Sequence, residues 1–264
     1  MSNQNTPQGA VNALAKKNPN ANSLHEYLKA QGMNAIQKVA AKHLNPERVL
    51  QIGWNAIRGN QMLLKCEKTS LLTGIIEATQ LGLQVDGVLG HAYLVPRRNK
   101  GVWEAQMQIG YRGLINLAHR GGAVLGVDAR VVKAGDPFSY GFGTESYLRH
   151  SKSESGRGEV THAYCIITLK DGAKDFEVWT REEINANMKR SQSAKSGYSP
   201  WATDFDEMAR KGVTRNKLKY VPMESEALHA VVRDEYRDFG VAGAERAQVV
   251  EVEAAMSGAK AGAS

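Results

Sequence analysis

The order of hydrophobic patterns along the 264 residues restricts the fold more than any other feature of the chain. From residue 23 to residue 82 apolar side chains recur at helical spacing, and from residue 91 they alternate as in short strands. Helical spacing returns after residue 180. This order predicts an α+β protein, with a helical N-terminal part and a central antiparallel β-sheet whose hairpins are packed by helices, rather than a parallel doubly wound sheet.

Local start and turn signals give the elements their expected bounds. Ser23 and Glu26 form a candidate capping box in front of "LHEYLKA" and "NAIQKVAAKHL", and Asn45 is a candidate cap for "PERVLQIGWNAIRGN". Hairpins are expected around "NKG" and around Asp171–Gly172, where strand-like segments meet at short turns.

The charges are unevenly distributed. The chain has a net charge of +7, but residues 1–222 carry +11 and residues 223–264 carry −4. A basic body is typical of a protein with a polyanionic partner, and an acidic end is typical of a solvated tail, a partner site or both. We therefore expect a disordered tail (1–22), a core (23–222) and an acidic C-terminal helix with a flexible tail (223–264).

Several function classes lack their sequence signals. There is no apolar run long enough for a membrane span and no secretory signal, and Cys66 and Cys165 are far apart, as expected for reduced thiols in the cytoplasm. No GxxxxGK[ST] or HExxH motif occurs, so no cofactor or metal is expected. A metal-dependent nuclease that uses Asp128, Asp136 or nearby acids is kept as an alternative.

The segment "SPWATDFDEMARKGVTRNKLKYVP" (199–222) combines an apolar and a cationic pattern. Ser199 and Pro200 are typical of a helix start, and Trp201, Phe205 and Met208 form one apolar face that predicts core packing. The second half carries two rows of cations: Lys211, Arg215 and Lys219 in one, and Arg210 and Lys217 in the other. Because no acid stands four residues from Arg215, Lys217 or Lys219 to relieve the repulsion, the pattern predicts a phosphate-binding surface.

Further cations stand beside aromatic residues at turns and helix ends, as single-stranded nucleic acid would require. These candidate contacts are Arg97, Arg98 and Lys100 at the hairpin tip, Tyr111 and Arg112 in "IGYRG", Arg130 and Lys133 on a strand, and Lys189, Arg190 and Lys195 near residue 190. A solvated turn is an equal alternative for the hairpin tip. Arg130 and Lys133, three apart on a strand, are expected on opposite faces.

Five long segments follow one another between residues 57 and 222: "QLGLQVDGVLGHAYLVPRR", "QIGYRGLINLAHRGG", "ARVVKAGDPFSYGFG", "FEVWTREEI" and "SPWATDFDEMARKGVTRNKLKYVP". In their residues and in their order these segments resemble the RecT-type phage single-strand annealing proteins. Family members tend to have Thr where this chain has Gly212, and a glycine within a helix costs about 1 kcal/mol relative to alanine. Whether the helix continues through Gly212 is therefore a question for the structure.

The resemblance implies an ATP-independent recombinase that coats single-stranded DNA, anneals complementary strands through a duplex intermediate, and has a Rad52-like annealing core. It also implies a homo-oligomer, a ring or a helical filament, that works beside a phage exonuclease. On this basis Lys211, Arg215 and Lys219 are expected to line a DNA groove.

Two points stay open from the sequence. A passive single-strand-binding or nucleoid protein would have a similar basic surface but would slow the pairing of strands. The C-terminal helix, Ser225–Phe239, has an apolar side that fits docking on the body, binding of the exonuclease, or binding of the host single-strand-binding protein.

Overall fold

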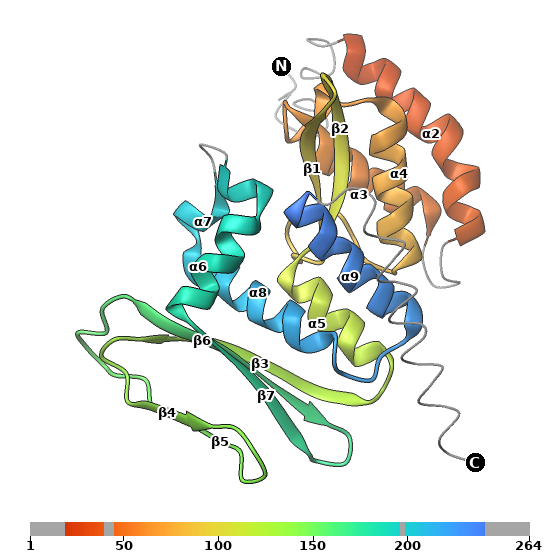
Figure 1. The fold of residues 1–264 in the computed structure, drawn as a ribbon. Helices are drawn as coiled ribbons and strands as arrows, with labels where there is room; N and C mark the ends of the chain where they lie inside the picture. The colour runs from red at the N-terminus through yellow and green to blue at the C-terminus, as the bar shows by residue number, and fades with distance from the viewer. Residues whose placement is uncertain (1–18, 40–44, 196–198, 241–264) are drawn as a thin grey trace, which may run out of the picture. The chain divides into compact units, whose positions relative to one another are not determined.

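The computed structural model describes residues 19–39, 45–195 and 199–240, which form two compact units, Met1–Gly113 and Leu114–Ser264 (Figure 1). Residues 1–18 of the expected tail and residues 241–264 of the acidic segment lie outside the described residues. Within the described ranges, no helix is both long and apolar enough to cross a membrane. Cys66 and Cys165 are free and buried.

The first unit contains three helices and a hairpin. Its elements are α2 (Pro19–Val39), α3 (Pro46–Arg58), η1 (Leu63–Lys65), α4 (Lys68–Gln80), β1 (Ala92–Asn99) and β2 (Val102–Ile109). The Asn45 side chain caps α3 by accepting hydrogen bonds from the N–H groups of Glu47 and Arg48, as predicted. The predicted capping box of Ser23 and Glu26 is wrong, because α2 begins at Pro19 and Ser23 lies inside this helix.

The first hairpin is confirmed. β1 and β2 pair antiparallel, and Lys100 and Gly101 connect them with φ angles of 45° and 91°. Positive φ at both central residues is the geometry of the tight hairpin turn that the sequence predicts. The hairpin packs on α4, where Gly74 leaves space for Leu94.

The second unit is a sheet with helices on one face and a hairpin on the other. α5 (Tyr111–Arg120) leads into it, and its further elements are β3 (Val124–Lys133), β4 (Phe138–Gly141), β5 (Tyr147–His150), β6 (Val160–Leu169), β7 (Lys174–Thr180), α6 (Arg181–Arg190), η2 (Gln192–Lys195), α7 (Pro200–Thr203), α8 (Phe205–Leu218) and α9 (Ser225–Phe239). The second hairpin is confirmed as β6 and β7, whereas β5 is a strand that the sequence patterns did not predict.

The three-stranded sheet has the antiparallel order β3-β6-β7. Val132, Tyr164 and Val178, one from each strand, form a cluster against which side chains of β4 and β5 pack. Because side chains alternate along a strand, buried Cys165 is directed to the opposite face, where α8 crosses the sheet. Figure 1 shows α8 on one side of this sheet and β4–β5 on the other.

The helix expected from Pro200 is interrupted, but not at Gly212. α7 ends at Thr203, Asp204 has φ −136°, and α8 starts at Phe205 and runs through Gly212 without a break. Trp201 is buried and its ring lies 5.8 Å from that of Phe205, so the predicted apolar face packs as expected. A glycine suits position 212, because a Cβ there would approach the Trp179 ring to 2.8 Å.

Candidate nucleic-acid interface

A cationic pocket lies where the edge strand β3 meets β5, the following loop and α8. It has a volume of about 340 Å³ and is lined by Arg130, Val131, His150, Lys152, Arg157, Tyr164, Asp206 and Arg210. Four of these side chains are cationic, and the one acidic side chain, Asp206, forms an ion pair of 3.2 Å with Lys133. The pocket therefore has an excess of positive charge that suits a phosphate group.

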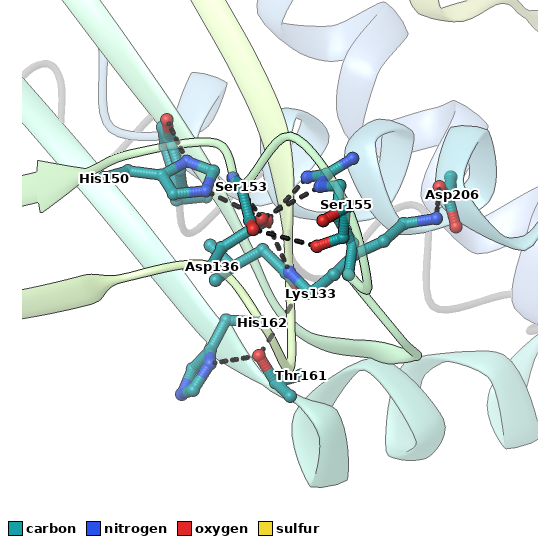
Figure 2. Close-up of polar contacts among 11 residues, drawn as sticks. Lys133, Asp136, His150, Ser153, Ser155, Thr161, His162 and Asp206 are labelled. Carbon is teal, nitrogen blue, oxygen red and sulfur yellow. Dashed lines mark hydrogen bonds and ion pairs between the residues drawn. The ribbon is translucent and has the colours of Figure 1, made fainter.

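Asp136 is a buried residue that holds several groups around this pocket in place through hydrogen bonds. Its carboxylate, buried completely, accepts hydrogen bonds from Arg157 Nε (2.9 Å) and Nη2 (2.5 Å), and from the N–H groups of Lys133 and Ser153 (both 2.9 Å). His150 Nε2 lies 3.3 Å away, and His150 Nδ1 lies 3.0 Å from the Tyr164 hydroxyl (Figure 2). The two-pronged contact holds the Arg157 guanidinium in one orientation at the pocket.

These donors also determine the protonation of the carboxyl group. The Arg157 hydrogen bond, helped by the backbone N–H groups and His150 and opposed by burial, holds the pKa of Asp136 far below its usual range. Asp136, which the nuclease alternative required as a metal ligand, is thus occupied by protein donors. Asp128, the other candidate, forms an ion pair of 3.1 Å with Arg130.

Arg210 is the α8 cation of this pocket. Its guanidinium is paired with Glu207 through Nη2, while its Nε is buried and has no hydrogen-bond partner among the described residues. A buried donor without a partner costs free energy, and a ligand in the pocket reaches this atom only if the side chain moves.

An aromatic surface continues from the pocket over β4 and β5. Phe138 stacks on Tyr164, which lines the pocket, with ring centroids 5.9 Å apart, and Phe142 stacks on Phe176 at 5.3 Å. Phe142 is 62% exposed and Tyr147 is 47% exposed. Phe142 directly follows β4 and Tyr147 begins β5, so both lie at the end of this strand pair that is remote from His150 of the pocket. Exposed aromatic rings are groups on which bases stack.

The pocket combines predicted residues with residues that sequence reasoning missed. Arg130 and Arg210 were predicted, and Lys133 lies beside them through its ion pair with Asp206. Lys152, Arg157 and His150 are not among the predicted contacts, and Lys152 and Arg157 belong to the polar loop "KSESGRGE". The available signal was the presence of Lys152 and Arg157 in a short Ser- and Gly-rich loop directly after a strand-like segment.

The predicted row Lys211, Arg215 and Lys219 is not open to solvent in this structure, but faces α9. Arg215 is 2% exposed, and its guanidinium lies 3.3 Å from Asp234 and 3.1 Å from Asp238. Lys211 lies 3.5 Å from Asp234, and Lys219 is paired with Glu235. The charge repulsion noted in the sequence is thus relieved by acids from another helix, which the spacing within α8 cannot reveal.

The remaining predicted residues of the second unit are dispersed. Lys217 is buried and paired with Asp175 of β7, and the Arg190 guanidinium lies 4.0 Å from the centre of the Phe239 ring. Lys189 is exposed at the end of α6, and Lys195 ends η2. Lys189, Arg190 and Lys217 do not line the pocket.

In the first unit, the predicted residues lie at two places. Arg98 and Lys100 are exposed at the hairpin tip, and Arg97 is partly buried. Tyr111 and Arg112 begin α5, with Arg112 exposed. One of the two glycines that flank this pair brings the chain close to itself: the Gly110 N–H donates a hydrogen bond to the His91 carbonyl at 2.9 Å.

The fold and this site define a class: an α+β protein with a cationic and aromatic sheet surface suited to a polyanion. Residues 47–250 match the sequence model of the RecT family. The chain is 41% identical over 198 residues to Protein RecT of Escherichia coli (strain K12), which covers 74% of this chain and 73% of that protein. It is also 29% identical over 176 residues to Uncharacterized protein YqaK of Bacillus subtilis (strain 168), which covers 66% of this chain and 59% of that protein.

The chain therefore belongs to the RecT family, the family of recombination-related single-strand annealing proteins that its motifs resemble.

Proposed function

We propose that this protein binds single-stranded DNA and anneals complementary strands without ATP. The observation that carries the proposal is the match to the RecT family over residues 47–250. The cationic pocket and the exposed aromatic side chains of the β4–β5 hairpin support a location for the bound strand.

In this proposal the phosphates of one strand contact Arg130, Lys152, Arg157 and Arg210. Asp136 keeps Arg157 oriented toward the strand. Exposed Phe142 and Tyr147 stack on neighbouring bases. Because phosphate contacts carry no sequence information, affinity is expected to depend on strand length and salt rather than on base sequence.

Annealing then follows from charge and geometry. Cations that neutralise one backbone lower its repulsion of the complementary strand, and bases with exposed pairing edges are free to test that strand. The exposed cations at the hairpin tip, Arg98 and Lys100, and exposed Arg112 are proposed as additional backbone contacts. Assembly into a ring or a helical filament, partnership with a phage exonuclease and a host single-strand-binding protein, and a cytoplasmic location belong to the same proposal.

The direct test is the annealing of two complementary fluorescent oligonucleotides without ATP or metal, over a series of salt concentrations. We expect the protein to accelerate pairing above the spontaneous rate, with less acceleration as salt rises. Tight binding that slows pairing would make it a passive single-strand-binding protein instead. Cleavage that a chelator abolishes would support the nuclease alternative.

The pocket is tested separately with a double variant, Lys152→Gln and Arg210→Gln. We expect weaker binding to oligonucleotides of every sequence and slower annealing, with unchanged secondary structure. The matched control is Lys170→Gln, which removes one exposed charge at the β6–β7 turn, away from the pocket residues. Equal affinity of the double variant and the control would locate the DNA contacts elsewhere.

A further inference from the structure

The contact between α8 and α9 is an ionic seam of three cations and three acids. Along α8, Lys211, Arg215 and Lys219 follow at intervals of four residues, so they form a continuous row. On α9 the matching acids are Asp234, Glu235 and Asp238, and the four cation–acid pairs already described link the two rows.

The seam is tight at its centre and open at its ends. Arg215 is 2% exposed, whereas the side chains of Lys211 and Lys219 are 16% and 23% exposed. The acids of α9 thus occupy the positions at which anionic oxygens bind the α8 row. A ligand that competes with these acids for the α8 cations must therefore carry several closely spaced anionic groups.

We propose that α9 is an acidic cover over a second phosphate-binding face of the protein, the row Lys211, Arg215 and Lys219, and that the backbone of single-stranded DNA displaces its acids. The inference rests on the proposed function and adds its regulation. Its motivation is charge complementarity: the body carries a net charge of +11, and the described acids of residues 223–240 include the three that cover this row.

The α9 helix has two kinds of attachment, and only one of them competes with DNA. Leu228, Val231 and Val232 are buried, and they keep the helix near the body through apolar contacts that salt does not weaken. The acids sit further along the helix. Burial opposes the charge of Asp238, but Arg215, Lys211 and a hydrogen bond from Ser191 keep its pKa below the ordinary value, so this acid is anionic at neutral pH.

A cover and a purely structural helix make opposite predictions. If the acids only stabilise the fold, neutralising one of them leaves DNA affinity unchanged or lowers it. If they compete with phosphates, neutralising one raises DNA affinity, and the gain depends on the cation that it covered.

The experiment uses the full chain and measures the affinity of a fluorescent single-stranded oligonucleotide by anisotropy. Glu235→Gln removes the partner of Lys219, and Glu226→Gln is the matched control, an exposed acid in the first turn of the same helix. We expect Glu235→Gln to bind about threefold more tightly, the size expected of a partly exposed ion pair, and Glu226→Gln to bind as the wild type does.

A double-mutant cycle decides the cause. In a Lys219→Gln background, Glu235→Gln should no longer tighten binding. A gain that persists in this background, a gain of equal size in Glu226→Gln, or no gain at all in a folded variant overturns the proposal.

Hydrogen exchange on the wild type covers the case in which Glu235→Gln does not fold. Addition of the oligonucleotide should speed the exchange of amides in the second half of α9, and unchanged or slower exchange there overturns the cover. If the wild type anneals strands but these tests fail, the cover proposal is wrong and the proposed function still holds. If no variant binds the oligonucleotide, the proposed function itself fails.

Discussion

Asp136 is one buried residue whose contacts both stabilise the second unit and hold pocket residues in position. Its carboxylate holds Arg157 and two backbone N–H groups, and it faces His150 as well. Asparagine has a similar shape but no charge, and its amide nitrogen cannot accept hydrogen bonds. Substitution at this position therefore tests the charge rather than the size of the side chain.

We expect Asp136→Asn to lower the melting temperature at pH 7 by about 5 °C, which corresponds to the loss of about one hydrogen bond to a charged group in a domain of this size. The pKa of Asp136 is lowered in the folded protein, so its charge stabilises the fold above about pH 4, the ordinary range of the unfolded carboxyl group. The stability difference between wild type and variant should shrink as the pH falls below 4. Urea unfolding at pH 7, 5 and 3.5 measures it, and a difference that does not depend on pH would contradict this account.

Phe142 gives a second prediction at the scale of one residue. Because it is 62% exposed, Phe142→Ala should leave the melting temperature nearly unchanged, and because its ring is available to a base, single-stranded DNA should bind about tenfold more weakly. Leu125→Ala is the control, since Leu125 is 60% exposed but has no aromatic ring. Anisotropy titrations measure both variants, and equal affinities would remove Phe142 from the DNA interface.

At the scale of elements, the start of α5 depends on two glycines, Gly110 and Gly113, because a side chain at either position would collide with the backbone. A Cβ on Gly113 would lie 2.0 Å from the His91 carbonyl oxygen, and a Cβ on Gly110 would lie 2.1 Å from that of Gly90. Backbone atoms cannot move aside as a flexible side chain can. The glycines of "GYRG" therefore allow the loop before β1 to contact the first turn of α5.

We expect Gly113→Ala to lower the free energy of unfolding by about 3 kcal/mol, at the upper end of the usual cost of overpacking, although alanine is the better helix former. Gly126→Ala is the control, because its added Cβ would meet only Thr168, at 3.8 Å, and its effect should stay within about 0.5 kcal/mol. Denaturant unfolding compares the two. A stable Gly113→Ala variant would mean that the loop before β1 moves away readily.

At the scale of the whole molecule, the dominant property is the net charge of +7 and its division into a basic body and an acidic end. Binding through phosphates releases counterions, so the logarithm of the affinity for single-stranded DNA should fall linearly with the logarithm of salt concentration. Each neutralised phosphate contributes about 0.7 to the slope.

We therefore expect the triple variant Arg130→Gln, Lys152→Gln and Arg210→Gln to reduce the magnitude of this slope by about 2, relative to the wild type. Affinity measured at four or more salt concentrations gives both slopes. A triple variant with weaker binding but an unchanged slope would indicate that these side chains support the fold and do not contact phosphates.

The sequence alone determined most of the elements and the family. Helical spacing, strand alternation, the cap at Asn45 and the turns at Lys100–Gly101 and Asp171–Gly172 are local signals, and each of them predicted an element that the structure contains. The RecT resemblance could also be found from the sequence, because each of its motifs is a run of consecutive residues.

Only the tertiary structure decided which charges face solvent. It brought Arg130, Lys152 and Arg210 from separate segments to one pocket, and it placed the acids of α9 against Arg215. It also ended α7 at Asp204 and left α8 continuous at Gly212, where the glycine makes room for Trp179. Periodicity reports which side of a helix a residue occupies, but not what lies opposite that side, because the partner comes from a distant part of the chain.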